Sequence, residues 1–291
     1  MAKILITGGT GLVGKRLTEM LVENNHEVLV LSRNPKKDNE FRWNLSENYI
    51  DEKALEGTEY IIHLAGAGIA DKRWTKERKK VIIDSRVKTA NQLFNKINEH
   101  KIQLKGFISA SGIGYYGALT NNKTYKETDK PGTDFIANVC KQWEKAAEQF
   151  SNKSIPITIL RTGIVLSKEG GALEKMKTPI ISPLGSGKQH MPWIHIDDLG
   201  QMYLNAVEGN LVGIFNAVAP ENHTSKTFSK ALAKSLKRPY LAIGVPGFLL
   251  KLMFGNLSVI LLEGSKISAK KIEKRGFSFR FRTLKKALNN L

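Results

Sequence analysis

A short apolar run followed by regularly spaced glycines restricts the fold of this chain more than any other feature. Residues 3–6 read Lys-Ile-Leu-Ile, which is typical of a buried parallel strand. Gly8, Gly11 and Gly14 follow in a G-x-x-G-x-x-G spacing. Glycines at these positions permit a tight turn, close approach of the backbone to a pyrophosphate, and close packing of the next helix on the sheet. The amphipathic helix expected over residues 12–24 would direct its first N–H groups at the phosphates.

The surrounding sequence favours a dinucleotide site over a glycine-rich turn without a ligand. Residues 27–31 read Glu-Val-Leu-Val-Leu and predict a second strand. This strand completes a strand–helix–strand unit, which is the context that the glycine motif requires. We therefore expect cofactor contacts from the turn and from the start of the helix. These residues are Gly8, Thr10, Gly11, Leu12, Val13 and Gly14.

The end of the second strand favours NADP over NAD. An NAD enzyme usually places Asp or Glu there to bind the ribose 2′-hydroxyl, but this sequence reads Ser32-Arg33-Asn34. A guanidinium matches the geometry of a phosphate group, so Arg33 is expected to pair with the 2′-phosphate. The alternative is an arginine that is simply exposed on a loop.

Apolar runs alternate with helical patterns along the next part of the chain. Strands are expected at residues 60–66, 106–111 and 157–161, and helices at about 75–99 and 133–149. This alternation predicts an α/β fold, a Rossmann doubly wound parallel sheet with a smaller C-terminal substrate lobe. Ligands then lie at the carboxyl ends of the strands.

The length of 291 residues allows a nucleotide-binding domain and a smaller module. We predict an NAD(P)-binding Rossmann domain over residues 1–235, with lobe insertions after residue 165, and a C-terminal domain over residues 236–291. The longest apolar stretch, residues 245–262, is interrupted by Lys251 and predicts buried helix and loop rather than a membrane span.

The composition indicates a reduced, cytoplasmic protein. Cys140 is the single cysteine, so no intrachain disulfide can form, and no Cys/His cluster suggests a metal site. Met1 leads almost directly into the first strand, which leaves no room for a signal peptide.

The formal net charge of +18 raises the question of nucleic-acid or acidic-membrane binding. The lysines are scattered through every segment, however, and no array of arginines and aromatic residues appears. We interpret the charge as a solvated surface, and we expect a small-molecule substrate and neither nucleic acid nor membrane as a partner. An oligomer is compatible with the sequence.

Further motifs follow the glycine turn along essentially the whole chain. They lie at residues 63–66, 84–87, 111–117, 134–135, 143–144, 161–166, 185–187, 192–195, 238–239 and 276–277. In combination they resemble the extended short-chain dehydrogenase/reductases. The closer resemblance is to the atypical, NAD-dependent epimerase/dehydratase-like branch with a C-terminal domain of unknown function.

The resemblance implies an NAD(P)-binding core with a C-terminal substrate lobe. The cofactor contacts that it implies come from Ser32, Arg33, Leu64, Ala65, Arg86 and Thr162. At the end of the third strand, the small residues up to Gly66 would let the cofactor lie against the sheet. The resemblance does not supply a substrate.

One part of the family pattern is missing. In the superfamily a tyrosine transfers the proton of the substrate oxygen, a lysine one helical turn later lowers the pKa of that tyrosine, and a serine hydrogen-bonds the substrate. Ser111 matches the serine, but Ile136 and Cys140 stand where the Tyr-x-x-x-Lys pair is expected. Isoleucine cannot transfer a proton, so this helix does not provide the standard mechanism.

Two readings follow from the missing pair. The first is an NADP-dependent oxidoreductase or epimerase-like enzyme for a small oxygenated metabolite, with Ser111 and either Tyr115 or Tyr116 as catalytic residues. The second is a catalytically silent NADP-binding sensor or scaffold. Lys188, Gln189 and His190 follow a glycine loop that could reach the substrate, or they are simply solvated. His195 lies in an apolar strand and is expected to be structural.

Overall fold

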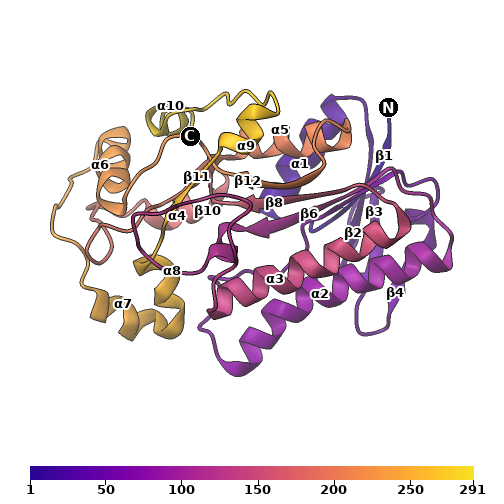
Figure 1. Cartoon of the computed structure of the whole chain (residues 1–291), viewed down its shortest axis with the longest axis horizontal. Coiled ribbons are helices and arrows are strands. Elements are labelled where there is room, and N and C mark those ends of the chain that lie inside the picture. The colour runs from indigo at the N-terminus through magenta and orange to yellow at the C-terminus, as the bar shows by residue number, and fades with distance from the viewer.

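A computed structural model describes residues 1–291, and its core is one large sheet of eight strands (Figure 1). The strands lie in the order β12-β8-β6-β5-β1-β2-β3-β4. All neighbours pair in parallel except β4, which runs antiparallel to β3. The bounds are Lys3–Thr7 for β1, Glu27–Ser32 for β2, Glu40–Asn44 for β3, Tyr49–Ile50 for β4, Tyr60–His63 for β5, Gly106–Gly112 for β6, Ile157–Thr162 for β8 and Gly213–Ala217 for β12.

Helices cover both faces of the sheet, which confirms the doubly wound prediction. Helices α1 (Leu12–Glu23) and α5 (Ile196–Val207) pack together on one face, and α2 (Lys76–Glu99) and α3 (Phe135–Glu148) pack together on the other (Figure 1). Side chains of β1 alternate between the two layers: Ile4 and Ile6 belong to the core under α1 and α5, and Leu5 to the core under α2 and α3. Burial on both faces explains the continuous apolar run of this strand.

A second lobe forms from the later part of the chain. Strands β9 (Ile164–Ser167), β10 (Gly170–Gly171) and β11 (Trp193–His195) form a small sheet, and β13 (Lys266–Ile267) pairs with β7 (Thr124–Tyr125). The remaining helices are α4 (Ala172–Met176), α6 (Ser225–Leu236), α7 (Gly247–Phe254), α8 (Val259–Leu262), α9 (Lys270–Lys274) and α10 (Leu284–Asn290). Short 3₁₀ turns lie at Glu52–Ala54, Ile113–Tyr116, Gln149–Lys153 and Gly255–Ser258.

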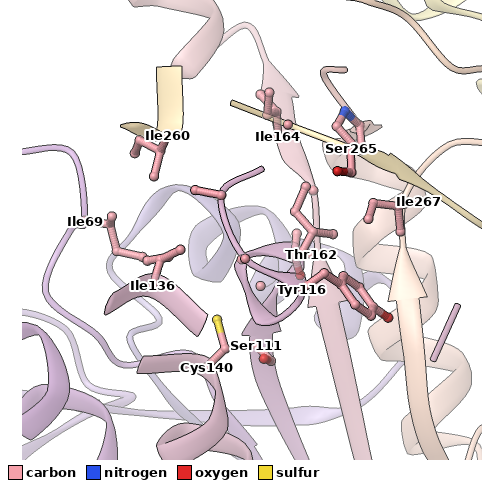
Figure 2. A pocket seen from close by; sticks show the side chains of 18 of the residues that line it. Ile69, Ser111, Tyr116, Ile136, Cys140, Thr162, Ile164, Ile260, Ser265 and Ile267 are labelled. Atoms are coloured by element: carbon pink, nitrogen blue, oxygen red, sulfur yellow. The ribbon is translucent and has the colours of Figure 1, made fainter. Parts of the chain in front are cut away.

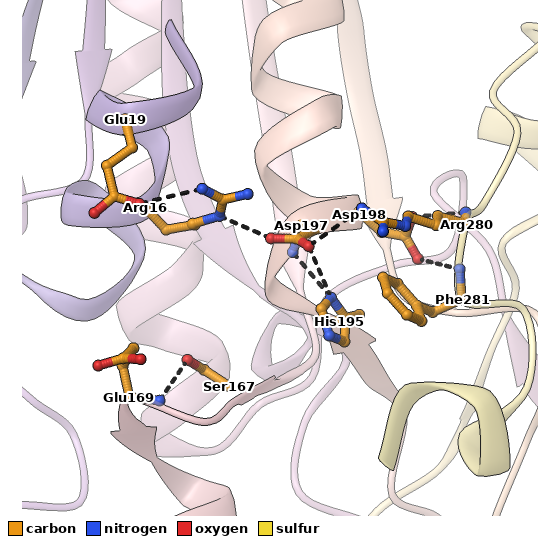
Figure 3. Close-up of polar contacts among 9 residues, drawn as sticks. All are labelled: Arg16, Glu19, Ser167, Glu169, His195, Asp197, Asp198, Arg280 and Phe281. Carbon is orange, nitrogen blue, oxygen red and sulfur yellow. Dashed lines mark hydrogen bonds and ion pairs between the residues drawn. The ribbon is translucent and has the colours of Figure 1, made fainter. Parts of the chain in front are cut away.

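His195 at the end of β11 and Asp198 at the start of α5 hold the C-terminal segment in place (Figure 3). The Asp198 carboxylate accepts the backbone N–H groups of Arg280 and Phe281 at 2.8 and 3.0 Å. The His195 ring stacks on the Phe281 ring with 3.7 Å between centroids, and its Nδ1 accepts the backbone N–H of Asp197 at the start of α5. Burial lowers the pKa of His195 to about 4, so the ring is neutral and structural.

The apolar stretch at residues 245–262 forms helices, but the prediction that it is buried is only partly right. Leu250 and Leu257 are buried, whereas Phe248 and Leu252 on α7 are 74% and 72% exposed. None of the helices has both the length and the apolar character needed to cross a membrane.

Candidate functional site

The glycine turn joins β1 to α1 in a backbone shape that side chains would block. Gly8 has a φ of +74°, a conformation that favours glycine. A Cβ on Gly14 would lie 2.3 Å from the carbonyl oxygen of Gly8, so the helix can pack this closely only without a side chain there. Gly11 is the N-cap of α1 and offers no side-chain cap. The first N–H groups of the helix are therefore free of side-chain acceptors, as an anion-binding turn requires.

The ends of β5 and β2 border this turn. A Cβ on Gly8 would lie 3.0 Å from the backbone of Leu64 and Ala65, so these residues lie directly against the turn. The Ser32 side chain is buried and its hydroxyl accepts the backbone N–H of Asn34 at 3.2 Å. Arg33 is exposed and its side chain makes neither a hydrogen bond nor an ion pair within the protein, which leaves the guanidinium free.

A cavity of about 420 Å³ lies further along the same sheet edge, beyond the ends of β6 and β8 (Figure 2). Ser111 and Gly112 from β6 and Thr162 from β8 form one side of it, and Cys140 from α3 lies next to them. Most of the larger side chains in its wall are branched and apolar. They are Ile69, Ile113, Ile136, Val139, Ile164, Ile260 and Ile267.

Ser111 belongs to a buried polar network beneath the cavity. Its hydroxyl donates to Oε1 of Glu144 at 2.7 Å. Arg161 binds the same carboxylate through both Nε and Nη2, each at 2.8 Å, and both side chains are buried. The serine hydroxyl therefore lines the cavity with its proton directed at Glu144, and it faces a ligand as a hydrogen-bond acceptor.

The two tyrosines occupy different places. The Tyr116 hydroxyl donates to Asn216 at 2.6 Å and accepts from Arg161 at 3.0 Å, and Figure 2 shows its ring directed away from Cys140. Burial raises the pKa of Tyr116 to about 12. The Tyr115 ring lies under the Arg161 guanidinium, 3.3 Å from its central carbon, and is not part of the cavity wall. The geometry gives both rings roles in packing around Arg161.

Ile136 and Cys140 do face the cavity from α3, at the positions where the family pattern places Tyr and Lys. A Cβ on Gly114 would lie 2.7 Å from the Ile136 side chain, so this isoleucine fills the space beside the β6–α3 loop. The Cys140 thiol is buried, and burial together with the nearby Glu144 carboxylate raises its pKa to about 12. Neither side chain transfers a proton at neutral pH.

Arg86 lies on α2, and its positive charge is close enough to Cys140 to interact with the thiol. Its Nη1 donates to the carbonyl oxygens of Ala67 and Ile82 at 3.0 and 2.9 Å, and its guanidinium lies 4.8 Å from the centre of the Trp143 ring. A Cβ on Gly66 would lie 2.8 Å from the guanidinium carbon. Burial lowers the pKa of Arg86 to about 10, which still leaves it charged. Its Nη2 is neither hydrogen-bonded within the protein nor fully buried.

His190 lines the cavity from the lobe. Its backbone N–H donates to Gly264 at 2.9 Å, which fixes the residue against the C-terminal segment. Nδ1 of the ring is buried, whereas Nε2 is neither buried nor hydrogen-bonded within the protein. Burial and the charge of Lys266 lower the pKa of His190 below its ordinary value.

Sequence reasoning missed the part of the wall that comes from the C-terminal segment. Ile260, Glu263, Gly264, Ser265 and Ile267 all line the cavity. No motif marks them, because their position depends on the pairing of β13 with β7 and on contacts far apart in the chain. No group of three or more His, Cys, Asp or Glu side chains is arranged to hold a metal ion.

Fold and glycine turn together define a Rossmann-type α/β protein of the short-chain dehydrogenase/reductase kind. The sequence model of the NAD dependent epimerase/dehydratase family matches residues 4–217, and that of a domain of unknown function, DUF1731, matches residues 245–291. The chain belongs to the NAD dependent epimerase/dehydratase family.

Several relatives match along their whole length. An epimerase family protein of Staphylococcus aureus is 33% identical over 100% of this chain and 99% of its own. The epimerase family protein SDR39U1 of Mus musculus is 34% identical, with 99% of each chain covered. The crystal structure of human SDR39U1 with NADPH superposes with a TM-score of 0.89 at 29% identity, covering 99% of this chain and 98% of that chain. A UDP-glucuronic acid 4-epimerase from Bacillus cereus, solved with NAD and a fluorinated substrate analogue, is 19% identical with a TM-score of 0.78 and shares the fold.

Proposed function

We propose that this protein is an NADP-dependent oxidoreductase or epimerase-like enzyme that acts on a small oxygenated metabolite. The proposal rests on one observation: the glycine turn and the cavity lie along the same edge of the large sheet. The glycine turn at the end of β1 and the cavity at the ends of β6 and β8 both lie where ligands bind in doubly wound sheets. A dinucleotide that starts at the turn would reach the cavity with its nicotinamide end.

The residues of the nucleotide site fit this cofactor. The turn leaves room for a pyrophosphate because it has no side chains at Gly8, Gly11 and Gly14, where a Cβ would meet neighbouring backbone. The free N–H groups at the start of α1 suit the negative charge of the pyrophosphate. The unpaired Arg33 guanidinium suits a 2′-phosphate, in keeping with the NADPH bound in the human SDR39U1 structure. Other structures that share the fold contain NAD, so the preference for NADP rests on Arg33.

Arg86 would hold the cofactor near the cavity. Its positive charge acts on the Cys140 position, where the family lysine would otherwise bring one, and its Nη2 is free. Leu64, Ala65, Gly66 and Thr162 would provide the surface on which the cofactor rests. A bound nicotinamide supplies or accepts a hydride, and Ser111 would orient the substrate beside it.

His190 is the cavity residue suited to exchange the proton. The expected tyrosine is replaced by Ile136, and the Tyr116 hydroxyl is engaged with Asn216 and Arg161. The Nε2 atom of His190 is open, and an imidazole can both give and take a proton. We include His190 in the proposed mechanism on this ground.

A second candidate function is a silent NADP-binding sensor. The absence of a phenol at position 136 and the buried Tyr116 favour it. Calorimetric titration with NADP, NADPH, NAD and NADH comes first, and both candidates expect tight binding of the phosphorylated pair. No binding of any of the four would refute both.

Turnover separates the two candidates. An enzyme would oxidise NADPH with a panel of aldehydes and ketones. The His190→Gln variant should then bind NADPH normally but lose most of its activity, and the residual activity should lack the alkaline limb of the pH–rate profile that deprotonation of His190 produces. Lys188→Gln on the same loop should behave as wild type. A sensor would show no oxidation with any carbonyl compound.

A further inference from the structure

Branched aliphatic side chains make up much of the wall of the cavity. Seven branched aliphatic side chains come from five regions of the chain: the loop before α2, the 3₁₀ turn Ile113–Tyr116, helix α3, strand β9 and the C-terminal segment. In Figure 2, Ile69, Ile136 and Ile260 face Ile164 and Ile267 across the opening. A ligand between them would contact hydrocarbon on both sides.

Charged groups in the wall do not suit a phosphate. Of all the residues that line the cavity, only Arg86 and Glu263 carry a formal charge. Arg86 lies at the side of α2 and α3, where we assign it to the cofactor. The Glu263 carboxylate accepts a hydrogen bond from Thr120 at 2.6 Å and would repel an anionic ligand. No lysine lines the cavity.

The hydroxyl groups of the wall are already used within the protein. Ser111 donates to Glu144, Ser265 to the carbonyl oxygen of Leu119, and Thr162 to that of Leu160. A sugar with many hydroxyl groups would find few free partners, and its polar groups would be buried without compensation. The small volume of about 420 Å³ also has to admit the nicotinamide ring.

We propose that the cavity binds a small, neutral and mainly apolar carbonyl compound rather than a nucleotide sugar, an inference that rests on the proposed function. In the reductive direction the carbonyl carbon would receive a hydride from NADPH, and the oxygen would receive a proton from the protonated His190 ring. The products are the alcohol, NADP⁺ and neutral His190, which takes up one proton from the solvent before the next turnover. The single open hydrogen-bonding group on His190 matches the single oxygen of such a substrate.

Ligand binding tests this proposal directly. The probes are straight-chain 2-ketones from butanone to octanone, with UDP-glucose as the polar comparison, titrated calorimetrically into the protein saturated with NADP⁺. Each added methylene should tighten binding about fourfold until the cavity is full, because each buried methylene contributes about the same transfer free energy. UDP-glucose should not bind. Equal affinities along the ketone series, or tighter binding of UDP-glucose, would overturn the proposal.

A pair of matched variants locates the binding. Ile260→Asn places an amide in the cavity wall, and it should weaken the octanone complex on the order of tenfold. Ile243→Asn makes the same change at a position that is 73% exposed and outside the cavity, so it should leave affinity unchanged. Equal effects of the two variants would contradict binding in this cavity. Thermal unfolding of both variants shows that they remain folded.

The same titrations without nucleotide keep the two proposals apart. If NADP⁺ does not bind, the proposed function fails. The ketone series on the free protein then still measures how the affinity of the cavity depends on the length of the ligand. If NADP⁺ binds and the ketones do not, the proposed function stands and the substrate class is wrong.

Discussion

Arg161 and Glu144 form a two-point ion pair directly beneath the cavity, with Nε–Oε1 and Nη2–Oε2 distances of 2.8 Å each. Their side chains are 1% and 5% exposed. Burial opposes the charge of Arg161, but the hydrogen bonds and charge of Glu144 outweigh it, and the pKa of Arg161 is raised. The pair also holds the Ser111 hydroxyl, so the floor of the site and the stability of the sheet depend on the same carboxylate.

Removing one partner of this pair should be strongly destabilising. Glu144→Ala leaves a buried guanidinium without its counter-charge, and we expect a loss of about 3–5 kcal/mol in the free energy of unfolding. The double variant Glu144→Leu/Arg161→Met removes both charges and should recover most of that loss. Urea denaturation of the three proteins measures both effects. A double variant as unstable as Glu144→Ala would show that packing, not charge, dominates at this position.

Arg33→Ala should change the choice between the two cofactors. The side chain is exposed and makes neither a hydrogen bond nor an ion pair within the protein, so the variant should unfold at the same temperature as wild type. Loss of a charge-assisted contact to the 2′-phosphate should weaken NADPH binding on the order of 10- to 100-fold and leave NADH binding unchanged. Calorimetry with both nucleotides decides the matter. An equal loss for both would mean that Arg33 does not read the 2′-phosphate.

The Rossmann core was predictable because each of its elements is encoded locally. The run at residues 3–6 alternates between two buried layers, and the glycines after it admit only one kind of turn. The helices at α1, α2 and α3 begin and end within two residues of their predicted bounds. The absence of Tyr-x-x-x-Lys was also visible, and α3 does present Ile136 and Cys140 to the cavity.

The cavity itself was not predictable, because long-range contacts assemble it. Tyr116 meets Asn216 across 100 positions of sequence, and the hydroxyl of Ser265 meets Leu119 across 146. Nothing in the local pattern marks Tyr116 as a partner of Arg161 rather than of a substrate. Sequence spacing alone left Tyr115 and Tyr116 as catalytic candidates, and only the fold shows which groups their rings and hydroxyls contact.

Stability should fall between about pH 6.5 and pH 4 because two buried histidines are neutral in the folded protein. Burial lowers the pKa of His63 and of His195 from 6.5 to about 4 in each case. The unfolded chain therefore binds more protons than the folded one in this window, so stability is complete above pH 6.5 and decreases as the pH falls. Each histidine should account for a loss on the order of 3 kcal/mol across the full window.

Urea denaturation from about pH 7.5 down to about pH 5 measures this dependence. The His195→Asn variant keeps an acceptor for the backbone N–H of Asp197 and removes one titrating group. Its dependence on pH should be less steep than that of wild type, with His63 and His190 accounting for the remainder. An unchanged slope would assign the effect to other groups.

Gly14→Ala should abolish nucleotide binding through the backbone alone. The added Cβ would lie 2.3 Å from the Gly8 oxygen and 2.6 Å from the Gly9 Cα, so α1 must move away from the turn. The N–H groups that we assign to the pyrophosphate would move with it, and we expect NADPH affinity to fall at least tenfold, with a loss of stability on the order of 1–3 kcal/mol from overpacking.

Gly247→Ala is the matched control, because a Cβ there meets only Leu262 at 3.5 Å. It lies on α7, outside the cradle, and should bind NADPH as wild type does. Calorimetry and urea denaturation of both variants test the assignment, and retained affinity in Gly14→Ala would place the phosphates elsewhere.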